Sequence, residues 1–391
     1  MREALKKESQ NHLHDSVWYL GEAPYIFAYY CKNRLPEEVF FGQLTFRSII
    51  QIINNLTGWG YGFSELSSRI AGGQYSGIHK AKEAGADCVK IQTYTPDTLT
   101  LNCHKPQYAS GGIWAGSYSY DLYCEAYTPF EWGEVIKKEC ENVGIDFFSA
   151  PFDETAVDYL ESIGCEFYKI ASPELVHIPL IHKVAATGKP IVMSCGKGTP
   201  EEIQEALDVC KEEGNEQIVL LKCCSMYPAE YDQMNLSVIP EMAKRYGYPV
   251  GLSDHSMGRL ADVTAVALGA CVIEKHFCLS RAIKNPDCSF SMEPHEFQQM
   301  VADVNNAKLT LGDGNAFLLP KEWSSRDGRP SILIAKDIKA GEVFSPENIK
   351  VRRPGHGLHS RYYYNIIGKH AAADLEFGDG LKFEDIKESI K

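Results

Sequence analysis

From about residue 61, short apolar runs alternate with longer stretches of helical periodicity. The apolar runs have the length and composition of buried strands and cover 60–66, 88–94, 146–152, 166–172, 190–196, 218–224, 249–255 and 272–277. The helical stretches cover 76–86, 128–144, 154–164, 178–188, 200–214, 238–247 and 258–270. Near-continuously apolar strands separated by helices indicate a parallel sheet that is buried on both faces. Eight such units over about 250 residues predict a closed (β/α)8 TIM barrel.

Polar side chains gather where the predicted strands end. Ser253, Asp254 and His255 close one apolar run, and Glu274, Lys275 and His276 close the next. In a TIM barrel, the chemistry takes place at the carboxyl ends of the strands. The clustering of polar residues at one end of the strands therefore indicates an enzyme.

The chain beyond the barrel divides into further segments. We place the barrel at 61–316, a linker rich in proline and charge at 317–330, and a small module of strands and turns at 331–391. Residues 1–60 are apolar and aromatic without clear periodicity, so we assign them no role.

Composition narrows the class of protein. A net charge of −13 with no basic stripe argues against nucleic acid as a partner. No apolar run reaches the roughly 18–20 residues that a membrane helix needs. The thirteen cysteines lack metal-ligand spacing, and Cys88, Cys165, Cys195 and Cys271 lie in apolar runs. We therefore expect reduced core thiols in a cytoplasmic protein.

Several stretches, taken in order, resemble the sialic acid synthase family. They are "AKEAGADCVKIQTYTPDTLT", "FFSAPFD", "FYKIASPE", "GKPIVMSCG", "LLKCCSMYPA", "VGLSDHS", "IEKHF", "NPDCSFSMEP" and "RRPGHGLHSRYY". Within the family, "KCCSMYPAEY" and "RPGHGLHSRYY" look most like the pseudaminic acid synthases. The resemblance covers roughly residues 80–391 and includes the C-terminal antifreeze-like (SAF) module.

The resemblance implies a condensation of phosphoenolpyruvate with an N-acetylated amino-sugar aldehyde and water, which gives a nine-carbon 2-keto sugar acid and phosphate. His255 and His276 match the family's ligands for a divalent metal, Mn²⁺ or Mg²⁺, and two imidazoles leave positions open for water and a sugar oxygen. The residues that match the phosphoenolpyruvate site are Lys90, Ser149, Lys169, Ser172, Ser194, Ser225 and Ser253. We take the two lysines to be unpaired within the protein, and unpaired lysines at a barrel mouth indicate an anionic ligand because a buried ammonium group is costly without an anion.

Two glutamates match family positions at the site. We interpret Glu65 as the general base and Glu174 as a ligand of a sugar hydroxyl. Tyr227 and Asp287 match contacts to the amino sugar. Arg353 lies in the C-terminal module, which the family exchanges between subunits, so the resemblance implies a domain-swapped homodimer.

Two alternatives stay open. The residues that match the sugar-binding positions do not distinguish a pseudaminic acid synthase from an N-acetylneuraminate or legionaminate synthase. The loop after the first predicted strand keeps Glu65 and Ser67, but Arg69 and Ile70 stand where the family has Asn and His. A catalytically impaired barrel, kept as a binding protein, is therefore the third interpretation.

Overall fold

The computed structural model describes residues 47–52, 76–283, 286–312, 314 and 317–387. The chain divides into two compact units, residues 1–312 and 313–391, and each is considered separately. The domain limits given above stay a prediction.

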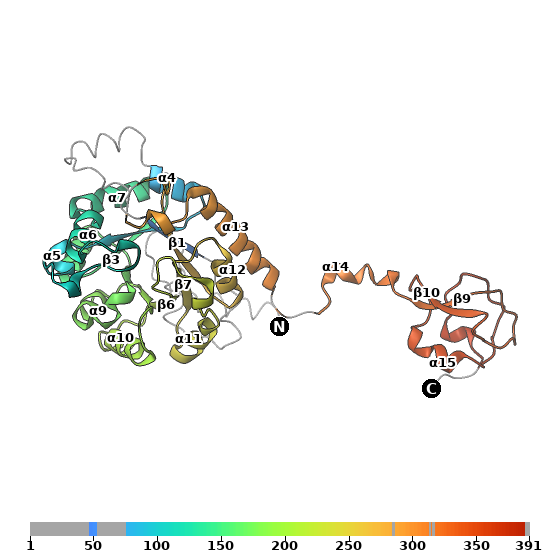
Figure 1. Cartoon of the computed structure of the whole chain (residues 1–391). Helices are drawn as coiled ribbons and strands as arrows, with labels where there is room; N and C mark the ends of the chain where they lie inside the picture. Colours follow the sequence, from blue (N-terminus) through green and yellow to red (C-terminus); the bar gives the residue numbers. More distant parts are fainter. Residues whose placement is uncertain (1–46, 53–75, 284–285, 313, 315–316, 388–391) are drawn as a thin grey trace. The chain divides into compact units, whose positions relative to one another are not determined.

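The first unit is a closed barrel of eight strands in the order β1 to β8, which confirms the predicted fold (Figure 1). Every neighbouring pair is parallel, and β1 closes the barrel by pairing with both β2 and β8. The strands are β1 Arg47–Ile52, β2 Cys88–Thr93, β3 Asp146–Pro151, β4 Tyr168–Ile170, β5 Ile191–Ser194, β6 Ile218–Cys223, β7 Val250–Asp254 and β8 Val272–Phe277.

The position of the first strand corrects the sequence analysis. We expected it at 60–66, but the strand that closes the barrel is Arg47–Ile52, within the segment to which we assigned no role. The run 60–66 lies outside the described residues. The first strand was misplaced because "RSIIQI" continues the apolar stretch "QLTF" with no turn cluster directly before it, although Asn54 and Asn55 follow it closely.

Helices surround the strands, and their ends follow local capping rules (Figure 1). Thr199 and Glu202 form a capping box with Pro200 in the first turn of α10. Gly144 ends α7 in the left-handed region, at φ 69°. The helices around the barrel are α4 Ser76–Glu83, α7 Phe130–Val143, α8 Glu154–Ser162, α9 Ile178–Ala185, α10 Pro200–Glu212, α11 Val238–Tyr246, α12 Leu260–Ala267 and α13 Pro294–Leu311.

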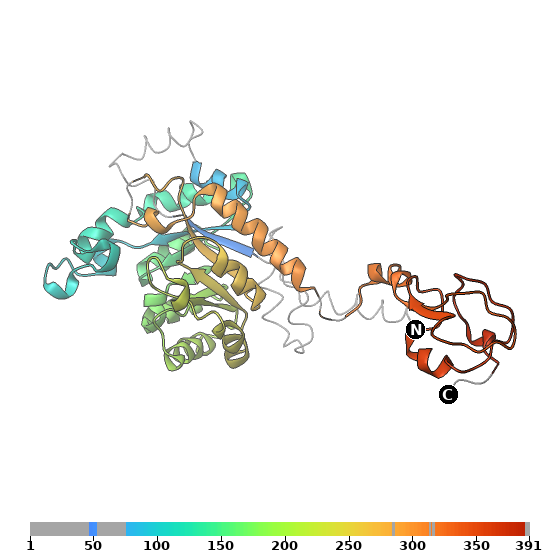
Figure 2. The same ribbon diagram turned by 45° about the vertical axis from the view of Figure 1, so that its right-hand side comes forward.

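Between β2 and α7 the chain leaves the regular pattern. It forms two short helices, α5 Pro96–Leu99 and α6 Ser119–Ala126, separated by turns. This cyan-to-teal segment projects from the barrel in Figure 2. Tyr94 and Phe152 pack at its base with their ring centroids 5.2 Å apart.

The core of the first unit joins strands and helices in one apolar cluster. Cys88, Cys165, Cys195 and Cys271 are all buried in it, as a small hydrophobic side chain is. No helix among the described residues is long and apolar enough to cross a membrane.

The second unit has its own small core. The strands β9 Ser331–Ile334 and β10 Ile349–Arg352 pair antiparallel, and Ile332, Phe344 and Leu381 are fully buried beside them. Its helices are α14 Pro320–Trp323 and α15 Tyr363–Ile366. Unlike the barrel, it consists mainly of turns.

Candidate active site

A cavity of about 420 Å³ opens at the carboxyl ends of the barrel strands. Most of the strands contribute a polar side chain to its lining, as a TIM-barrel site requires. These side chains are Lys90 and Gln92 from β2, Lys169 from β4, Ser194 from β5, Ser253 from β7, and Glu274 and His276 from β8.

Lys90 and Lys169 both contact one carboxylate in the site, that of Glu274. Lys169 Nζ lies 2.8 Å from both carboxylate oxygens of Glu274, and Lys90 Nζ lies 3.0 Å from Oε1. Ser253 donates a third hydrogen bond to the same oxygen at 2.9 Å. We call Lys90, Lys169 and Glu274 the charge triad. The expectation that the lysines are unpaired was wrong, because Glu274 neutralises part of their charge.

The charge triad is almost completely buried, and its members shift one another's pKa. Burial alone would raise the pKa of Glu274, but the ammonium groups of Lys169 and Lys90 outweigh burial and hold it well below its usual range. Burial lowers the pKa of Lys90 to about 8, although Glu274 opposes the shift. Two positive charges against one negative leave this part of the cavity suited to an anion.

The two predicted metal ligands lie side by side in the same cavity. The ring centroids of His255 and His276 are 5.1 Å apart, and we call them the imidazole pair. His255 Nδ1 lies 3.0 Å from the carbonyl oxygen of Cys224, which leaves Nε2 available. His276 Nδ1 is buried and makes no hydrogen bond to the described residues; a carboxylate oxygen of Asp287 lies 3.9 Å from it.

Burial and neighbouring groups shift the pKa values of the imidazole pair in opposite directions. Burial opposes a charge on His255, but contact with the Cys223 thiol outweighs this and raises the pKa of the imidazole. Burial and the neighbouring His255 charge hold the pKa of His276 well below its usual range. His276 is therefore neutral at pH 7, the state in which imidazole binds a metal.

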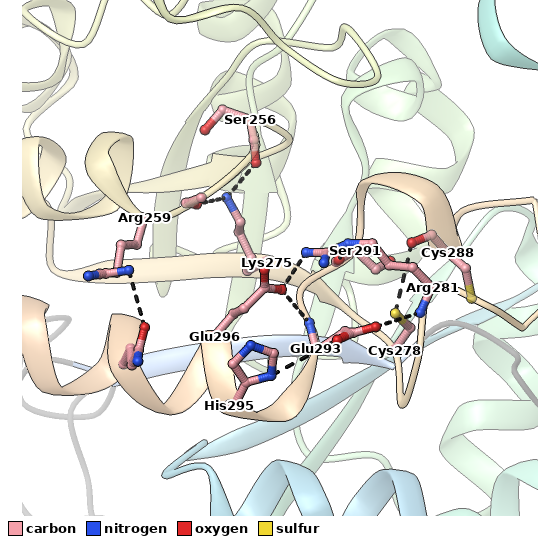
Figure 3. A network of polar contacts seen from close by, with 12 residues as sticks. Ser256, Arg259, Lys275, Cys278, Arg281, Cys288, Ser291, Glu293, His295 and Glu296 are labelled. Atoms are coloured by element: carbon pink, nitrogen blue, oxygen red, sulfur yellow. Dashed lines mark hydrogen bonds and ion pairs between the residues drawn. The ribbon is translucent and has the colours of Figure 1, made fainter.

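A second buried ion pair lies on the opposite face of the same two strands. Lys275 contacts the carboxylate of Asp254 and donates to the carbonyl oxygens of Ser256 at 2.7 Å and Gly258 at 3.0 Å. Figure 3 shows Lys275 reaching toward Ser256. Because strand residues alternate in direction, Asp254 and Lys275 point away from the face that carries His255 and His276.

The predicted serines fall into two groups. Ser172, Ser194 and Ser253 line the cavity, and the Ser194 hydroxyl is buried without a hydrogen-bond partner among the described residues. Ser149 does not line the cavity; its hydroxyl is bonded to Thr93 Oγ1 at 2.7 Å and to the Ile91 carbonyl at 3.1 Å. Ser225 does not line it either, and its hydroxyl lies 3.6 Å from the Cys223 sulfur.

Glu174 follows Ser172 and Pro173, which line the cavity, although Glu174 itself does not. It is buried in the short 3-10 helix Ser172–Val176, and its Oε2 has no hydrogen-bond partner in the described structure. Burial raises the pKa of this carboxyl to about 7. Glu174 can therefore both hold and release a proton near neutral pH.

The predicted sugar ligands Tyr227 and Asp287 both line the cavity. Tyr227 packs against His255 with ring centroids 4.3 Å apart. Asp287 lies in the loop after β8, and burial raises its pKa to about 6. Glu65 lies outside the described residues. Arg353 is an exposed residue of the second unit, just after β10.

Four cavity residues received no role from the sequence: Glu274 and Gln92, which stand among the polar residues at strand ends, and Lys197 and Trp114. Strand alternation contained the signal for Glu274, because it is two residues before His276 and so shares its face. The same rule relates Gln92 to Lys90. Lys197 stands out only in the structure, where it takes a left-handed φ of 64° beside the cavity.

Comparison with known proteins gives consistent matches for both units. The NeuB family matches residues 77–316, and the SAF domain matches residues 329–387. A pseudaminic acid synthase from Campylobacter jejuni subsp. jejuni serotype O:23/36 (strain 81-176) is 44% identical over 328 residues, which are 83% of this chain and 96% of that protein.

Two further similarities are informative. The N,N'-diacetyllegionaminic acid synthase of Legionella pneumophila is 34% identical over 316 residues, 79% of this chain and 89% of that protein. The crystal structure of N-acetylneuraminic acid synthetase from Leptospira borgpetersenii serovar Hardjo-bovis, in complex with citrate, has a TM-score of 0.61 at 26% identity and covers 72% of this chain and 90% of that chain.

Proposed function

The chain belongs to the NeuB family, and on this premise we propose that it condenses phosphoenolpyruvate with an N-acetylated amino-sugar aldehyde to make pseudaminic acid. It is thus a transferase-type synthase that forms a carbon–carbon bond. The observation that carries the proposal is that the charge triad and the imidazole pair open into one cavity. An anion and a carbonyl group can meet there.

The charge triad is the proposed phosphoenolpyruvate site. Lys90 and Lys169 hold ammonium groups in a buried position, where their attraction for a phosphate or carboxylate is stronger than in water. Ser172 and Ser194 supply hydroxyl groups on the same cavity wall, and Ser253 lines it too, with its hydroxyl donated to Glu274. Ser149 and Ser225 are proposed as supports of this site, since their hydroxyl groups already have partners within the protein.

The imidazole pair is the proposed site of a divalent cation, Mn²⁺ or Mg²⁺. The donor set fits such an ion: the His276 Nδ1 is buried without a hydrogen bond, and a backbone carbonyl orients His255. No cluster of three or more His, Cys, Asp or Glu side chains suited to a metal occurs among the described residues, so water and substrate would complete the coordination. The bound ion would polarise the sugar aldehyde.

The reaction balances with the groups at hand. The π electrons of the C2=C3 bond of phosphoenolpyruvate form the bond from C3 to the aldehyde carbon, whose oxygen becomes a hydroxyl. The oxygen of water adds to C2 and releases one proton, and the hydroxyl on C2 loses the second when the C2–O bond to phosphate breaks and C2 becomes the ketone. One of these protons ends on the former aldehyde oxygen and the other on the released phosphate.

We propose that Glu65 accepts the proton of that water. Glu174 is buried next to the lining residues Ser172 and Pro173, and we propose that it reaches a sugar hydroxyl once the sugar is bound. Tyr227 and Asp287 are the proposed further contacts to the sugar.

The remaining proposals concern substrate and assembly. N-acetylneuraminate and legionaminate synthesis are the alternatives within the class, and an impaired barrel is the alternative outside it because Arg69 and Ile70 depart from the family pattern. We also propose a cytoplasmic, domain-swapped homodimer in which Arg353 serves the sugar site of the partner subunit.

Phosphate release tests the function. The full-length protein is incubated with phosphoenolpyruvate, Mn²⁺ and, in separate reactions, the six-carbon precursor of pseudaminic, legionaminic or N-acetylneuraminic acid. Release with the pseudaminic acid precursor supports the proposal, and faster release with another precursor replaces it with that alternative. No release with any precursor, from protein whose far-ultraviolet circular dichroism shows a folded barrel, refutes the enzymatic proposal.

A further inference from the structure

A short hairpin, residues 109–118, forms part of the cavity wall between β2 and α6. Ala109 and Tyr118 pair in antiparallel fashion, and Ser110 N–H donates to the Ser117 carbonyl at 2.9 Å. Gly112 and Gly116 make the turn with positive φ angles of 63° and 99°. The hairpin thus presents Trp114 and Ser110, both of which line the cavity.

Trp114 joins the hairpin to the opposite side of the cavity mouth. Its indole N–H donates to the Pro286 carbonyl at 3.0 Å, next to Asp287. Its ring centroid lies 5.4 Å from that of Tyr227 and 6.4 Å from that of Phe290. Tyr227 and Phe290 are themselves 5.2 Å apart. We call these three rings the aromatic wall.

The loop that receives Trp114 is held in place by its own polar contacts. Arg281 donates through its backbone N–H to Glu293 at 2.9 Å and through Nε to the Ser291 carbonyl at 3.0 Å. It also forms an ion pair with Glu296, and Figure 3 shows these side chains converging. Because this network spans both sides of Phe290, one side of the aromatic wall is fixed in advance of any ligand.

The aromatic wall extends from the imidazole pair. Tyr227 contacts His255, and Phe290 lies 4.9 Å from His276 by ring centroids. Trp114 is therefore one ring further from the proposed aldehyde position. We therefore expect Trp114 to meet a substituent of the sugar rather than its reacting carbon.

Ser110 supplies a polar group at the same end of the cavity. Its hydroxyl oxygen is buried and has no hydrogen-bond partner among the described residues. A buried hydroxyl without a partner is costly, so a ligand that bonds to it recovers that cost. Aromatic faces beside one such hydroxyl suit a group that is apolar at one end and hydrogen-bonding at the other.

We infer that Trp114 and Ser110 form a subsite for an acylamino group of the sugar, in which the ring contacts the acyl methyl and the hydroxyl bonds to the amide. This inference rests on the proposed function, because it takes an N-acetylated amino sugar as the substrate. Beyond that function, we infer that the hairpin selects for the acyl group. Trp114 and Ser110, which make this selection, belong neither to the charge triad nor to the imidazole pair.

Ligand binding tests the subsite independently of turnover. The wild-type protein, Trp114→Ala, Trp114→Phe and Ser110→Ala are titrated by calorimetry with the N-acetylated precursor and with its N-formyl analogue, which lacks only the methyl groups. Saturation-transfer NMR then reports the contact of the acetyl methyl with the protein. Ile113→Ala is the matched control, because Ile113 is an exposed neighbour on the same turn that does not line the cavity.

We expect Trp114→Ala to weaken binding of the N-acetyl sugar by about 10-fold, the scale for losing apolar contact with one methyl group, and to leave the N-formyl sugar nearly unchanged. Trp114→Phe should keep most of the preference, since it keeps an aromatic face. Ser110→Ala should weaken both sugars by roughly 3- to 10-fold, as expected for one lost hydrogen bond. Ile113→Ala should bind like the wild type.

The outcomes separate this inference from the proposed function. Equal losses for both sugars in Trp114→Ala, or an unchanged methyl signal, overturn the subsite even when the wild type releases phosphate. Methyl contact that depends on Trp114, in a protein that releases no phosphate, supports the subsite and refutes the synthase. A wild type that binds neither sugar overturns the subsite.

Discussion

The ammonium group of Lys169 lies 2.8 Å from both carboxylate oxygens of Glu274, a residue 105 positions away in the sequence. Lys90 contacts the same carboxylate, so one buried anion holds two buried cations in the cavity wall. The positive charge needed to bind an anionic substrate is thus kept in place before the substrate arrives. Such preorganisation lowers the cost of binding.

Removing the negative charge from the triad should destabilise the protein. Glu274→Gln leaves two buried ammonium groups without a carboxylate, and breaking a buried ion pair costs about 3–5 kcal/mol. We expect the free energy of unfolding in urea to fall by that amount and to recover in part when phosphoenolpyruvate is added, because the anion replaces the lost charge.

The matched control for this change is Glu83→Gln, which breaks an exposed ion pair with Lys80. Exposed pairs contribute about 0–1 kcal/mol, so this variant should unfold nearly like the wild type. If Glu274→Gln is as stable as the control, the charge triad does not have the energetic role assigned to it.

Lys169→Met tests the cation directly. The substitution keeps most of the side chain but removes the ammonium group, so phosphoenolpyruvate binding should weaken by about 2–3 kcal/mol, the scale for a charge-assisted hydrogen bond. Calorimetric titration of the folded variant measures this loss. The KM for the amino sugar should change less, and a larger effect on the sugar than on phosphoenolpyruvate would refute the assignment.

The sequence predicted the barrel and seven of its strands because their apolar runs end at clear turn signals. It failed at β1, where "RSIIQI" is not separated from the apolar stretch before it by any turn cluster. It also failed to pair the lysines with Glu274, because contacts across a barrel depend on how neighbouring strands are staggered, which spacing along the chain does not reveal. Nor could the sequence predict the internal partners of Ser149 on β3, whose hydroxyl is hydrogen-bonded to Thr93 and to the Ile91 carbonyl on β2.

The imidazole pair makes a prediction about metal binding. His255→Ala and His276→Ala should each abolish tight Mn²⁺ binding, since each removes one of two protein ligands. Calorimetric titration with Mn²⁺ alone measures this, and circular dichroism checks the fold. His295→Ala, an exposed histidine on α13, is the control and should bind Mn²⁺ like the wild type. Tight binding that survives in both cavity variants would exclude these histidines as the ligands.

Glu174 makes a prediction about pH. Its folded pKa of about 7 lies above the ordinary glutamate value of about 4.3, so the unfolded chain ionises first as the pH rises. Glu174 therefore lowers stability progressively between about pH 4 and pH 7, and the penalty is constant above that range. Glu174→Gln has no such ionisation, so its stability relative to the wild type should increase with pH over this window.

Urea unfolding at half-unit pH intervals measures that difference. Glu205→Gln, the same change at an exposed position of α10, controls for effects of net charge. A stability difference between Glu174→Gln and the wild type that does not vary with pH would show that the Glu174 carboxyl is not held neutral by burial.

The proposed exchange of the C-terminal module predicts that two inactive proteins restore activity together. Arg353→Ala should disable the sugar site of the partner subunit, which this module serves. His276→Ala should disable the active site in the barrel of the same chain. In a swapped heterodimer one site receives both defects and the other receives neither, so activity should return toward half of the wild-type value in the mixed dimers. The measurement is phosphate release after subunit exchange, with exchange verified by native mass spectrometry of differently tagged chains. Each variant alone, taken through the same procedure, is the control. A mixture that forms heterodimers yet stays inactive would mean that Arg353 does not serve the partner subunit's site.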